Sequence, residues 1–230
     1  MKKIFIFLKS LSHMGAAAQE IAKEFKTTTY NSCEVIAADN QYIYLGYGIT
    51  ELFNILPKAQ YLYRLDFNLQ MVDSVNLTKG LSLDTNERLH LKDIEVDTNG
   101  NIYALCFIHE QNAPTQCNGR KSLLLKLGPS FQPLDTIYFE SDSLDITLVD
   151  MAIKKNTAVL TGSAFICNQI LRPYVAKINL NTSSVWSKFY DSLTYNTTLQ
   201  FIDPAFFADK IILHAVRGIG PPKVDYLRWF

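Results

Sequence analysis

Residues 61–77 read YLYRLDFNLQMVDSVNL, and residues 123–139 read LLLKLGPSFQPLDTIYF. The two stretches align without a gap at an offset of 62, which pairs Arg64 with Lys126. In both, β-branched and aromatic residues stand on each side of a polar break, a pattern that predicts strand, tight turn, strand. A third copy, YVAKINLNTSSVWSKFY, occupies residues 174–190. A repeated hairpin is therefore the unit from which the fold is built.

Another predicted strand pair precedes each hairpin. Residues 93–107 read DIEVDTNGNIYALCF, in which Asn99-Gly100 is a hairpin-turn dipeptide. Three further segments open on an acid and have the same order, at residues 34–48, 150–165 and 203–216. The first-strand acids are spaced 59, 57 and 53 residues apart, and they are Glu34, Asp93, Asp150 and Asp203. Each unit thus holds four short strands in about 55 residues.

Four-stranded units that repeat at this length are typical of β-propeller blades. The sequence therefore predicts an all-β fold, a β-propeller of about four four-stranded blades, either whole or a truncated part of a larger propeller. The alternative is a β-sandwich of about twelve or more strands, which has no reason to repeat its sequence. A propeller domain is expected over residues 19–230, with blades at residues 33–77, 92–140, 146–190 and 199–230.

A further match concerns the closure of the ring. Residues 22–31, AKEFKTTTYN, resemble residues 187–196, SKFYDSLTYN, at an offset of 165. At the other end, residues 226–230 resemble the third strand of a blade, and no fourth strand follows them. We expect the strand 22–31 to complete the last blade, since pairing the two ends removes exposed sheet edges.

The second unit carries a recognisable motif. Residues 93–103 fit D-x-x-x-D-x-x-G-N-I-Y, and L-L-K-L follows at residues 124–127. In this order of elements the chain resembles bacterial secreted β-propeller repeat proteins. The resemblance extends over nearly all residues after Gln19, although this blade alone matches closely. It implies a fold and no particular activity, because the motif is structural. Members of such families usually have about six or more blades, so the resemblance also suggests a partial propeller.

The first residues are organised like an export signal. Met1-Lys2-Lys3 is a charged start, residues 4–8 are apolar, and Ala16-Ala17-Ala18 precedes Gln19 as a small-residue cleavage site. We therefore expect a signal peptide at residues 1–18 and a secreted or periplasmic protein. The alternative is a short amphipathic helix. No run of about 18 apolar residues follows, so no membrane span is expected.

The composition limits the partners. Lys plus Arg and Asp plus Glu both number 22, which argues against a strongly basic nucleic-acid binder. The hydrophobic fraction of 48% is enough for a sizeable core. None of the four cysteines forms a C-x-x-C pair; they are Cys33, Cys106, Cys117 and Cys167. A disulfide between Cys106 and Cys117 and buried thiols are both compatible with this pattern.

Candidate chemistry is sparse. The histidines are His13, His90, His109 and His214. His109-Glu110 is expected in a plain loop, and His214 in the middle of a strand. The chain has no G-x-S-x-G elbow, phosphate-binding loop or H-E-x-x-H helix. No catalytic or cofactor-binding residue is therefore predicted.

The first-strand acids are the one candidate for a metal site. The first strand of a blade lines the central channel, so Glu34, Asp93, Asp150 and Asp203 are expected at one level around it. Like charges gathered there raise one another's pKa unless something compensates. Hydrogen bonds from backbone amides, which would fix the register between blades, are the favoured compensation. The alternative is a hard cation such as calcium, which prefers several oxygen ligands.

Two functions remain open. One is an extracytoplasmic binding or scaffold module that presents loops to a protein or glycan partner. The other is a propeller-fold glycan hydrolase or lyase with carboxylates at the channel mouth. The loops, such as residues 111–116, are polar but chemically mild. This favours the binding module over an enzyme.

Overall fold

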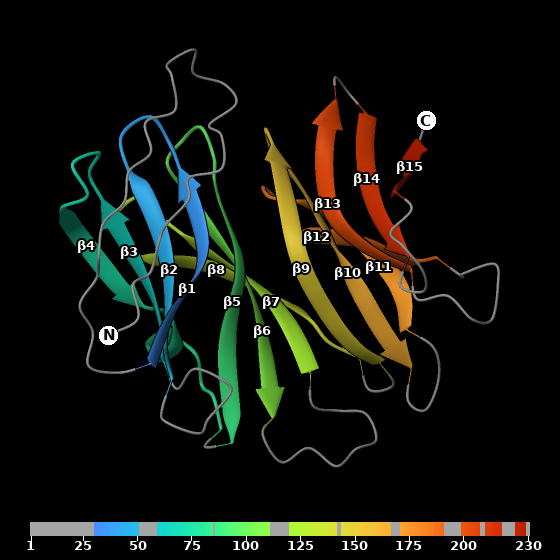
Figure 1. Cartoon of the computed structure of the whole chain (residues 1–230), viewed down its shortest axis with the longest axis horizontal. Helices are drawn as coiled ribbons and strands as arrows, with labels where there is room; N and C mark the ends of the chain where they lie inside the picture. The colour runs from blue at the N-terminus through green and yellow to red at the C-terminus, as the bar shows by residue number, and fades with distance from the viewer. Residues whose placement is uncertain are drawn as a thin grey trace.

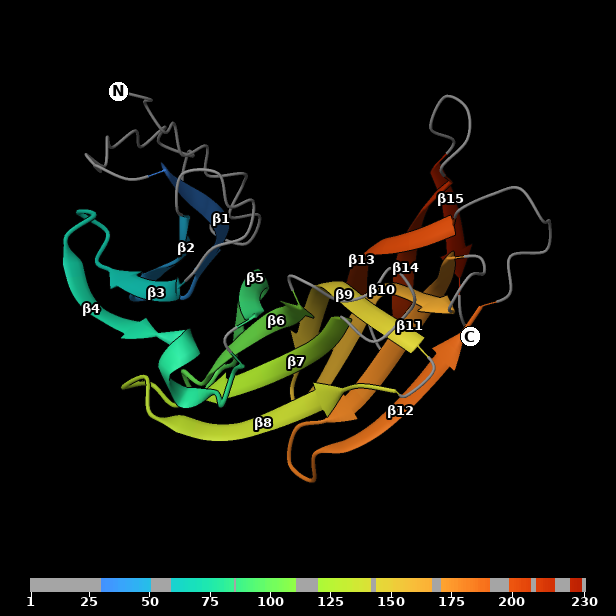
Figure 2. The ribbon, with the colours of Figure 1, turned by 90° about the horizontal axis from the view of Figure 1, so that it is seen from below.

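The structure is a computed structural model that describes residues 30–50, 59–84, 86–110, 120–141, 144–166, 171–190, 199–207, 210–217 and 224–228. Fifteen strands of this part of the chain form four antiparallel sheets, and a single short 3₁₀ helix, η1 (Leu77–Gly80), follows the first sheet. Figure 1 shows the sheets following one another in chain order, and Figure 2 shows them splayed around an arc. The predicted signal peptide, residues 1–18, lies outside the described residues.

Within every sheet the strands lie side by side in chain order. The first sheet consists of β1 (Tyr30–Ala38), β2 (Ile43–Thr50), β3 (Ala59–Leu65) and β4 (Met71–Asn76). The second consists of β5 (Glu87–Val96), β6 (Ile102–Glu110), β7 (Arg120–Leu127) and β8 (Pro133–Phe139). The third consists of β9 (Leu144–Lys154), β10 (Thr157–Ile166), β11 (Leu171–Asn179) and β12 (Ser184–Phe189). The fourth consists of β13 (Leu199–Phe207), β14 (Lys210–Arg217) and β15 (Val224–Arg228).

The first strands of successive sheets lie against one another: β1 contacts β5, β5 contacts β9, and β9 contacts β13. This is the arrangement of propeller blades, in which the first strand is innermost and the fourth is outermost. The predicted all-β fold, a β-propeller of about four blades, is confirmed. Three blades have four strands, and the fourth has three among the described residues. No helix in the described part of the chain has the length and hydrophobicity needed to cross a bilayer.

The gapless repeat of the outer hairpins corresponds to an identical backbone path. Arg64 pairs with Asp73 across β3 and β4, and Lys126 pairs with Asp135 across β7 and β8. One residue further towards the turn, both outer strands contain a bulge. Both turns then include a residue with φ of 60°, Leu69 in the first blade and Phe131 in the second.

Different side chains stabilise these two equivalent turns. In the first, Asp66 Oδ1 accepts a hydrogen bond from the N–H of Asn68 at 2.9 Å. The second has Gly128 in the place of Asp66, and Gln132 Oε1 accepts from the N–H of Ser130 at 3.0 Å. A Cβ on Gly128 would lie 2.0 Å from the Gln132 side chain, so the glycine leaves the space that this amide occupies.

The inner hairpin of the second blade turns where the sequence predicts. Asp97 Oδ1 accepts hydrogen bonds from the N–H groups of Asn99 (2.8 Å) and Asn101 (2.9 Å), and Asp97 Oδ2 accepts from the Tyr103 hydroxyl (3.2 Å). Gly100 adopts φ of +77°, which non-glycine residues rarely adopt. Asp97 is therefore a turn residue. The strand β6 that follows continues through His109 and Glu110, which pair with Arg88 and Glu87 of β5. The prediction that His109-Glu110 lies in a loop was wrong, because pairing with β5 extends beyond the apolar run.

The core lies between the blades. One cluster joins the first and second sheets through fully buried residues that include Leu62, Leu91, Cys106 and Leu123. A second cluster joins the second and third sheets, and a smaller one joins the third and fourth. Cys106 is thus a buried thiol, and Cys117, its possible disulfide partner, lies outside the described residues. Burying a Leu-sized side chain stabilises the fold by about 1.5–3 kcal/mol, so these interfaces dominate its stability.

Each innermost strand contains a bulge, and in the third blade Gly162 of β10 lies opposite it. A Cβ built on Gly162 would lie 2.1 Å from the carbonyl oxygen of Thr147 and 2.7 Å from the Cα of Leu148. Both atoms belong to the backbone of the neighbouring strand, so they cannot move aside without disturbing the sheet. Glycine is required here by close approach of two strands.

We expect Gly162→Ala to lower the free energy of unfolding by about 2–4 kcal/mol, because the added methyl group overpacks a fixed backbone. Gly80→Ala is the matched control, since nothing lies within 4 Å of a Cβ at that position. The control should change stability by less than about 0.5 kcal/mol. Urea unfolding followed by circular dichroism measures both, and equal stability of the two variants would contradict the close approach.

Candidate functional site

The first-strand acids lie at the bulges, in the middle of their strands. Pairing skips one residue in each innermost strand: Lys92 in β5, Val149 in β9 and Ile202 in β13. Asp93, Asp150 and Asp203 each follow the skipped residue, so these three acids occupy one repeated position. The prediction that each acid opens its strand was wrong, because the strand begins six residues before Asp93 and Asp150 and four residues before Asp203.

Glu34 does not share this position. In β1, Cys33 pairs with Tyr47 and Val35 pairs with Gly46, so Glu34 is itself the skipped residue. Its equivalent in the second blade is Lys92, and the equivalent of Asp93 in the first blade is Val35. The predicted ring of four carboxylates therefore has three members at one register position. The structure describes the side chains of two of them, Asp93 and Asp150.

Asp93 joins two blades. Its Oδ1 accepts a hydrogen bond from the N–H of Ile94 in its own strand, and its Oδ2 accepts one from the N–H of Met151 in β9, both at 2.8 Å. Met151 is the residue after Asp150, the equivalent acid of the next blade. Asp93 thus accepts one backbone hydrogen bond within its own blade and one from the next blade, and the second fixes the register between the two blades.

Asp150 cannot make the corresponding bond to the fourth blade. The residue equivalent to Met151 in that blade is Pro204, which follows Asp203. Proline has no N–H group to donate. The repeat is therefore broken chemically at this junction, as it also is in the first blade, where Val35 replaces the acid.

The Asp150 carboxyl lies beside Asp93 and Glu95 of β5. Burial, followed by the charge of Asp150 and a hydrogen bond with it, raises the pKa of Asp93 well above its ordinary value, against the opposing effect of the Met151 N–H. Burial and the charge of Asp150 raise the pKa of Glu95 from 4.5 to about 7, partly offset by the N–H of Val96. A hydrogen bond between two carboxyls requires a proton on one of them. Asp93, Glu95 and Asp150 thus form one carboxyl cluster, in which Glu95 is about half protonated at neutral pH.

A buried hydroxyl accompanies the carboxyl cluster. Thr161 pairs with Asp150 across β9 and β10, and none of its surface is exposed. Its Oγ1 has no hydrogen-bond partner among the described residues. Leaving a buried polar group unpaired costs about 1–3 kcal/mol, so an unpaired hydroxyl is uncommon in a folded protein. The same part of the chain contains no group of three or more His, Cys, Asp and Glu side chains that could hold a metal ion.

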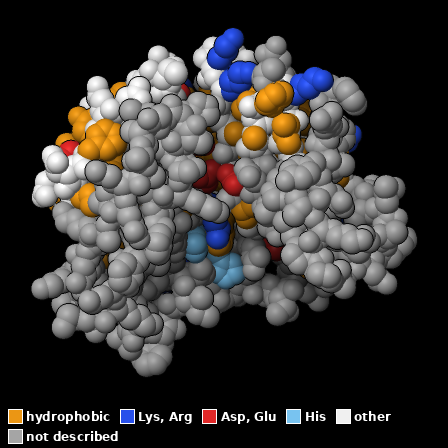
Figure 3. Space-filling view, turned by 45° about the horizontal axis from the view of Figure 1, so that its top comes forward, with side chains coloured by type: hydrophobic (Ala, Val, Ile, Leu, Met, Phe, Trp, Pro, Cys, Tyr) orange, Lys and Arg blue, Asp and Glu red, His pale blue; other side chains and the backbone are white. Residues whose placement is uncertain are grey.

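The surface near β5 has mixed charge. The His90 ring stacks on Phe107 with centroids 4.9 Å apart, and Lys92 Nζ lies 4.9 Å from the centroid of the same ring. Figure 3 shows acidic, basic and histidine side chains together in a hollow of the surface, between larger grey areas. Sequence analysis did not identify Glu95 or Thr161, because the role of each depends on contacts with residues of other strands.

The hydrogen bond from the Met151 N–H to Asp93, which joins the second and third blades, can be tested by substitution of Asp93. Asp93→Ala leaves the N–H groups of Ile94 and Met151 without their acceptor, which should lower the free energy of unfolding by about 2–3 kcal/mol. Asp93→Asn keeps one carbonyl oxygen, which can accept from one of the two N–H groups, and it removes the repulsion from Asp150. It should lose less stability than Asp93→Ala, about 1–2 kcal/mol. Urea titrations at pH 7 compare them, and equal loss in both variants would mean that charge matters more than the backbone bonds.

Glu95 makes stability depend on pH. Because its pKa is raised from 4.5 to about 7 on folding, the folded state holds an extra proton between these values. The stabilisation is therefore fully present below pH 4.5 and is lost as the pH rises through about 7. Allowing for solvent screening, we expect a loss of about 1–2 kcal/mol attributable to this group.

Glu95→Gln should remove that part of the pH dependence, since Gln does not ionise. Glu140→Gln is the matched control, because Glu140 is exposed on the surface. The difference between the unfolding free energies at pH 5 and pH 8 should be smaller for Glu95→Gln than for the wild type and the control. Parallel pH profiles of all three proteins would show that Glu95 titrates normally.

No protein-family model and no curated protein matches the chain. Among solved structures, 26 chains match. An α-L-arabinofuranosidase from Clostridium thermocellum ATCC 27405 is 12% identical with a TM-score of 0.48, and the match covers 79% of this chain and 59% of that chain. A mutant apocarotenoid oxygenase from Synechocystis is 15% identical with a TM-score of 0.40, covering 84% and 40%. This chain thus spans well under two thirds of both. Likeness at this level assigns no function, and the blade architecture stands on the strand contacts described above.

Proposed function

We propose that this protein is an extracytoplasmic β-propeller binding module that holds a hydroxyl-rich ligand, a glycan, at the Asp93–Glu95–Asp150 cluster. The location outside the cytoplasm is proposed from the charged start, apolar run and small-residue site of residues 1–18. The kinship with bacterial secreted propeller repeat proteins is proposed from the motif at residues 93–103. The site residues are proposed from the chemistry of the cluster.

The observation that carries the proposal is the gathering of three partly exposed carboxyls, Asp93, Glu95 and Asp150, beside the buried Thr161 hydroxyl, which has no partner among the described residues. A cluster that retains protons offers both donors and acceptors, and so does a hydroxyl. Sugar hydroxyls combine donor and acceptor in one atom and can satisfy such a mixed set. A glycan that carries carboxylates or sulfates is less suitable, since the ionised fraction of the cluster repels it.

A glycan hydrolase is the second candidate, and one observation favours it. The pKa of Glu95 is raised to about 7, which lets this carboxyl carry a proton at neutral pH as a general acid must. Asp150 is the neighbouring carboxyl that would act as its counterpart. In glycoside hydrolysis one carboxyl protonates the leaving oxygen and a second acts as base or nucleophile.

Glycan binding can be tested with a variant that preserves the fold. Asp150→Asn is close in shape to aspartate and removes only its charge, so stability should stay equal or rise. Affinity for the ligand should fall about tenfold, the value of one lost hydrogen bond. Glu140→Gln changes an exposed carboxyl outside the cluster; it is the matched control and should bind normally.

The probe is a glycan array of neutral, uronic-acid-containing and sulfated oligosaccharides, followed by calorimetric titration of the best binder. Binding to a neutral glycan that weakens in Asp150→Asn supports the module. Absence of binding across the array, or equal binding by both variants, would overturn it. Release of reducing ends that stops in Glu95→Gln would establish the hydrolase instead.

A further inference from the structure

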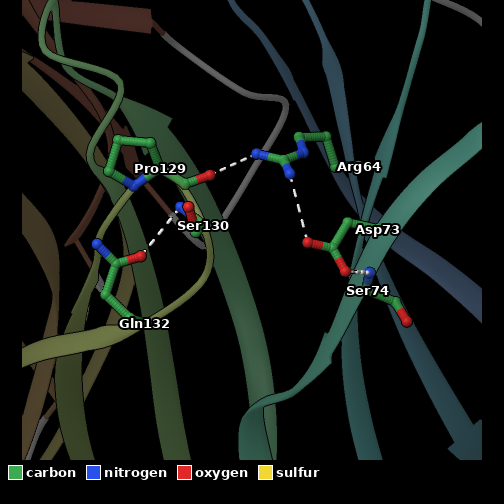
Figure 4. Close-up of polar contacts among 6 residues, drawn as sticks. All are labelled: Arg64, Asp73, Ser74, Pro129, Ser130 and Gln132. Atoms are coloured by element: carbon green, nitrogen blue, oxygen red, sulfur yellow. Dashed lines mark hydrogen bonds and ion pairs between the residues drawn. The ribbon is translucent and has the colours of Figure 1, made fainter.

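In the first two blades, the outer hairpin places a basic residue opposite an acid. Arg64 of β3 lies opposite Asp73 of β4, and the two side chains form an ion pair with 3.3 Å between Nη2 and Oδ2 (Figure 4). Lys126 of β7 lies opposite Asp135 of β8 in the second blade. The acid at this repeated position therefore supplies a negative charge next to the cation.

Both of these pairs are bonded to the blade that follows them. Arg64 also donates a hydrogen bond to the carbonyl oxygen of Pro129, in the outer turn of the second blade (Figure 4). Asp135 accepts a hydrogen bond from the hydroxyl of Ser183, in the outer turn of the third blade, at 2.6 Å. In the first two blades the position thus has a structural role, which is to join neighbouring blades.

The third blade departs from this pattern. Lys177 of β11 lies opposite Trp186 of β12, so an indole ring stands where the other two blades have the acid. Lys177 makes no side-chain hydrogen bond or ion pair within the described part of the chain. The two strands β11 and β12 contain no Asp or Glu, whereas they contain Arg172, Lys177 and Lys188. The hairpin therefore carries positive charge without an acid in either strand.

Lys177 and Trp186 line an open groove at the junction of the third and fourth blades. The other lining residues are Asn179, Ser184, Val185 and Ile211, the last of which belongs to β14. Figure 2 shows β12 as the outermost strand of the third blade. Of the strand predicted at residues 22–31 to complete the fourth blade, residues 22–29 lie outside the described residues. The groove has a volume of about 550 Å³, which lies within the range of small-ligand sites.

The groove combines one aromatic surface with a few polar groups. Trp186 is 54% exposed, so a face of its ring is accessible to a ligand. Asn179 Oδ1 accepts a hydrogen bond from the N–H of Asn181 at 3.0 Å, which leaves the Asn179 amide hydrogens for a ligand. Ser184 and Lys177 are exposed as well. These side chains offer hydrogen bonds to hydroxyl groups and one ammonium group to a carboxylate.

We propose that this groove is a second binding site, which holds a sugar ring that carries a carboxylate, a uronic acid residue of an acidic glycan. The apolar face of the sugar ring stacks on the Trp186 indole. Its carboxylate pairs with Lys177 and takes the place of the acid that the first two blades have there. The groove lies on outer strands and is positively charged, whereas the carboxyl cluster lies on inner strands. This inference therefore does not rest on the proposed function.

A uronic acid suits this groove better than other carboxylates do. The acidic side chain of a peptide has no flat apolar face for the indole. An aromatic carboxylate has such a face but no hydroxyl groups for Asn179 and Ser184. A uronic acid ring has the face, the hydroxyls and the charge together. Because the groove is open, neighbouring sugars of a glycan chain can extend beyond it.

Calorimetric titration tests the site with three uronic acid chains, oligogalacturonate, oligomannuronate and oligoglucuronate. The methyl ester of each chain is the matched control, since it has the same sugars without the charges. The protein should bind at least one charged chain about tenfold or more tightly than its ester, and added salt should weaken that binding. Absence of binding to all three chains, or equal affinity for a chain and its ester, would overturn the inference.

Two variants separate the roles of the ring and the charge. Trp186→Ala removes the ring and Lys177→Gln removes the charge, and both positions are exposed, so the fold should be preserved. Each should weaken binding of the uronic acid chain about tenfold, and Lys177→Gln should also reduce its salt dependence. Phe67→Ala and Lys79→Gln are the matched controls, because both residues are exposed and lie outside the third blade. Equal affinity of all four variants would contradict the assignment of the groove.

A further variant distinguishes this site from the carboxyl cluster. Asp150→Asn should leave binding of the uronic acid chain unchanged. Binding that is lost in Asp150→Asn and kept in Trp186→Ala would assign the chain to the cluster and overturn this inference. Failure of every neutral glycan to bind, with the uronic acid chain still bound, would overturn the proposed function alone. Sedimentation without glycan tests the other occupant of an exposed outer strand, a second copy of the chain. A dimer that dissociates in Trp186→Ala would assign the groove to that copy and also overturn the inference.

Discussion

Every sheet of this protein has to bury two apolar faces, and a blade can do so only between two other blades. The second blade shows the constraint most clearly, since β6 is buried without interruption from Ile102 to Ile108. Alternate residues face opposite neighbours: Ala104 packs towards the first blade and Leu105 towards the third. A strand with one solvent-exposed face would alternate between apolar and polar residues. The repeat therefore follows from packing, because each blade must present the same two surfaces.

The bulge in the innermost strand adds a polar contact to this packing. A skipped residue bends the strand and changes the direction of the next side chain. In the second blade that side chain is Asp93, whose carboxylate reaches the N–H of Met151 in the following blade. Directional bonds at the inner strands and apolar contacts further out fix the register together. Gly162 belongs to the same feature, since a strand can approach a bulge this closely only without a Cβ.

Much of the fold was predictable, because a gapless repeat reflects a repeated backbone. The outer hairpins and the turn at Asn99-Gly100 follow from local pattern alone. The register position of Glu34 could not be predicted from local pattern, because a bulge shifts the strand pairing by one residue and no residue type in the sequence marks it. The roles of Glu95 and Thr161 could not be found either, because they arise from contacts between strands that are distant in sequence. Asp93 and Asp150 were identified by their spacing, and the structure brings them together.

The candidate site lies at a junction where the repeat of acid and backbone donor is broken. Asp93 is compensated by the N–H of Met151, and the same position in the next blade is Pro204, which has no N–H. Asp150 shares its environment with two other carboxyls, and retained protons relieve part of their mutual repulsion. The proposed binding function rests on this combination of three carboxyls crowded at one junction and a buried Thr161 hydroxyl across the strand pair from Asp150.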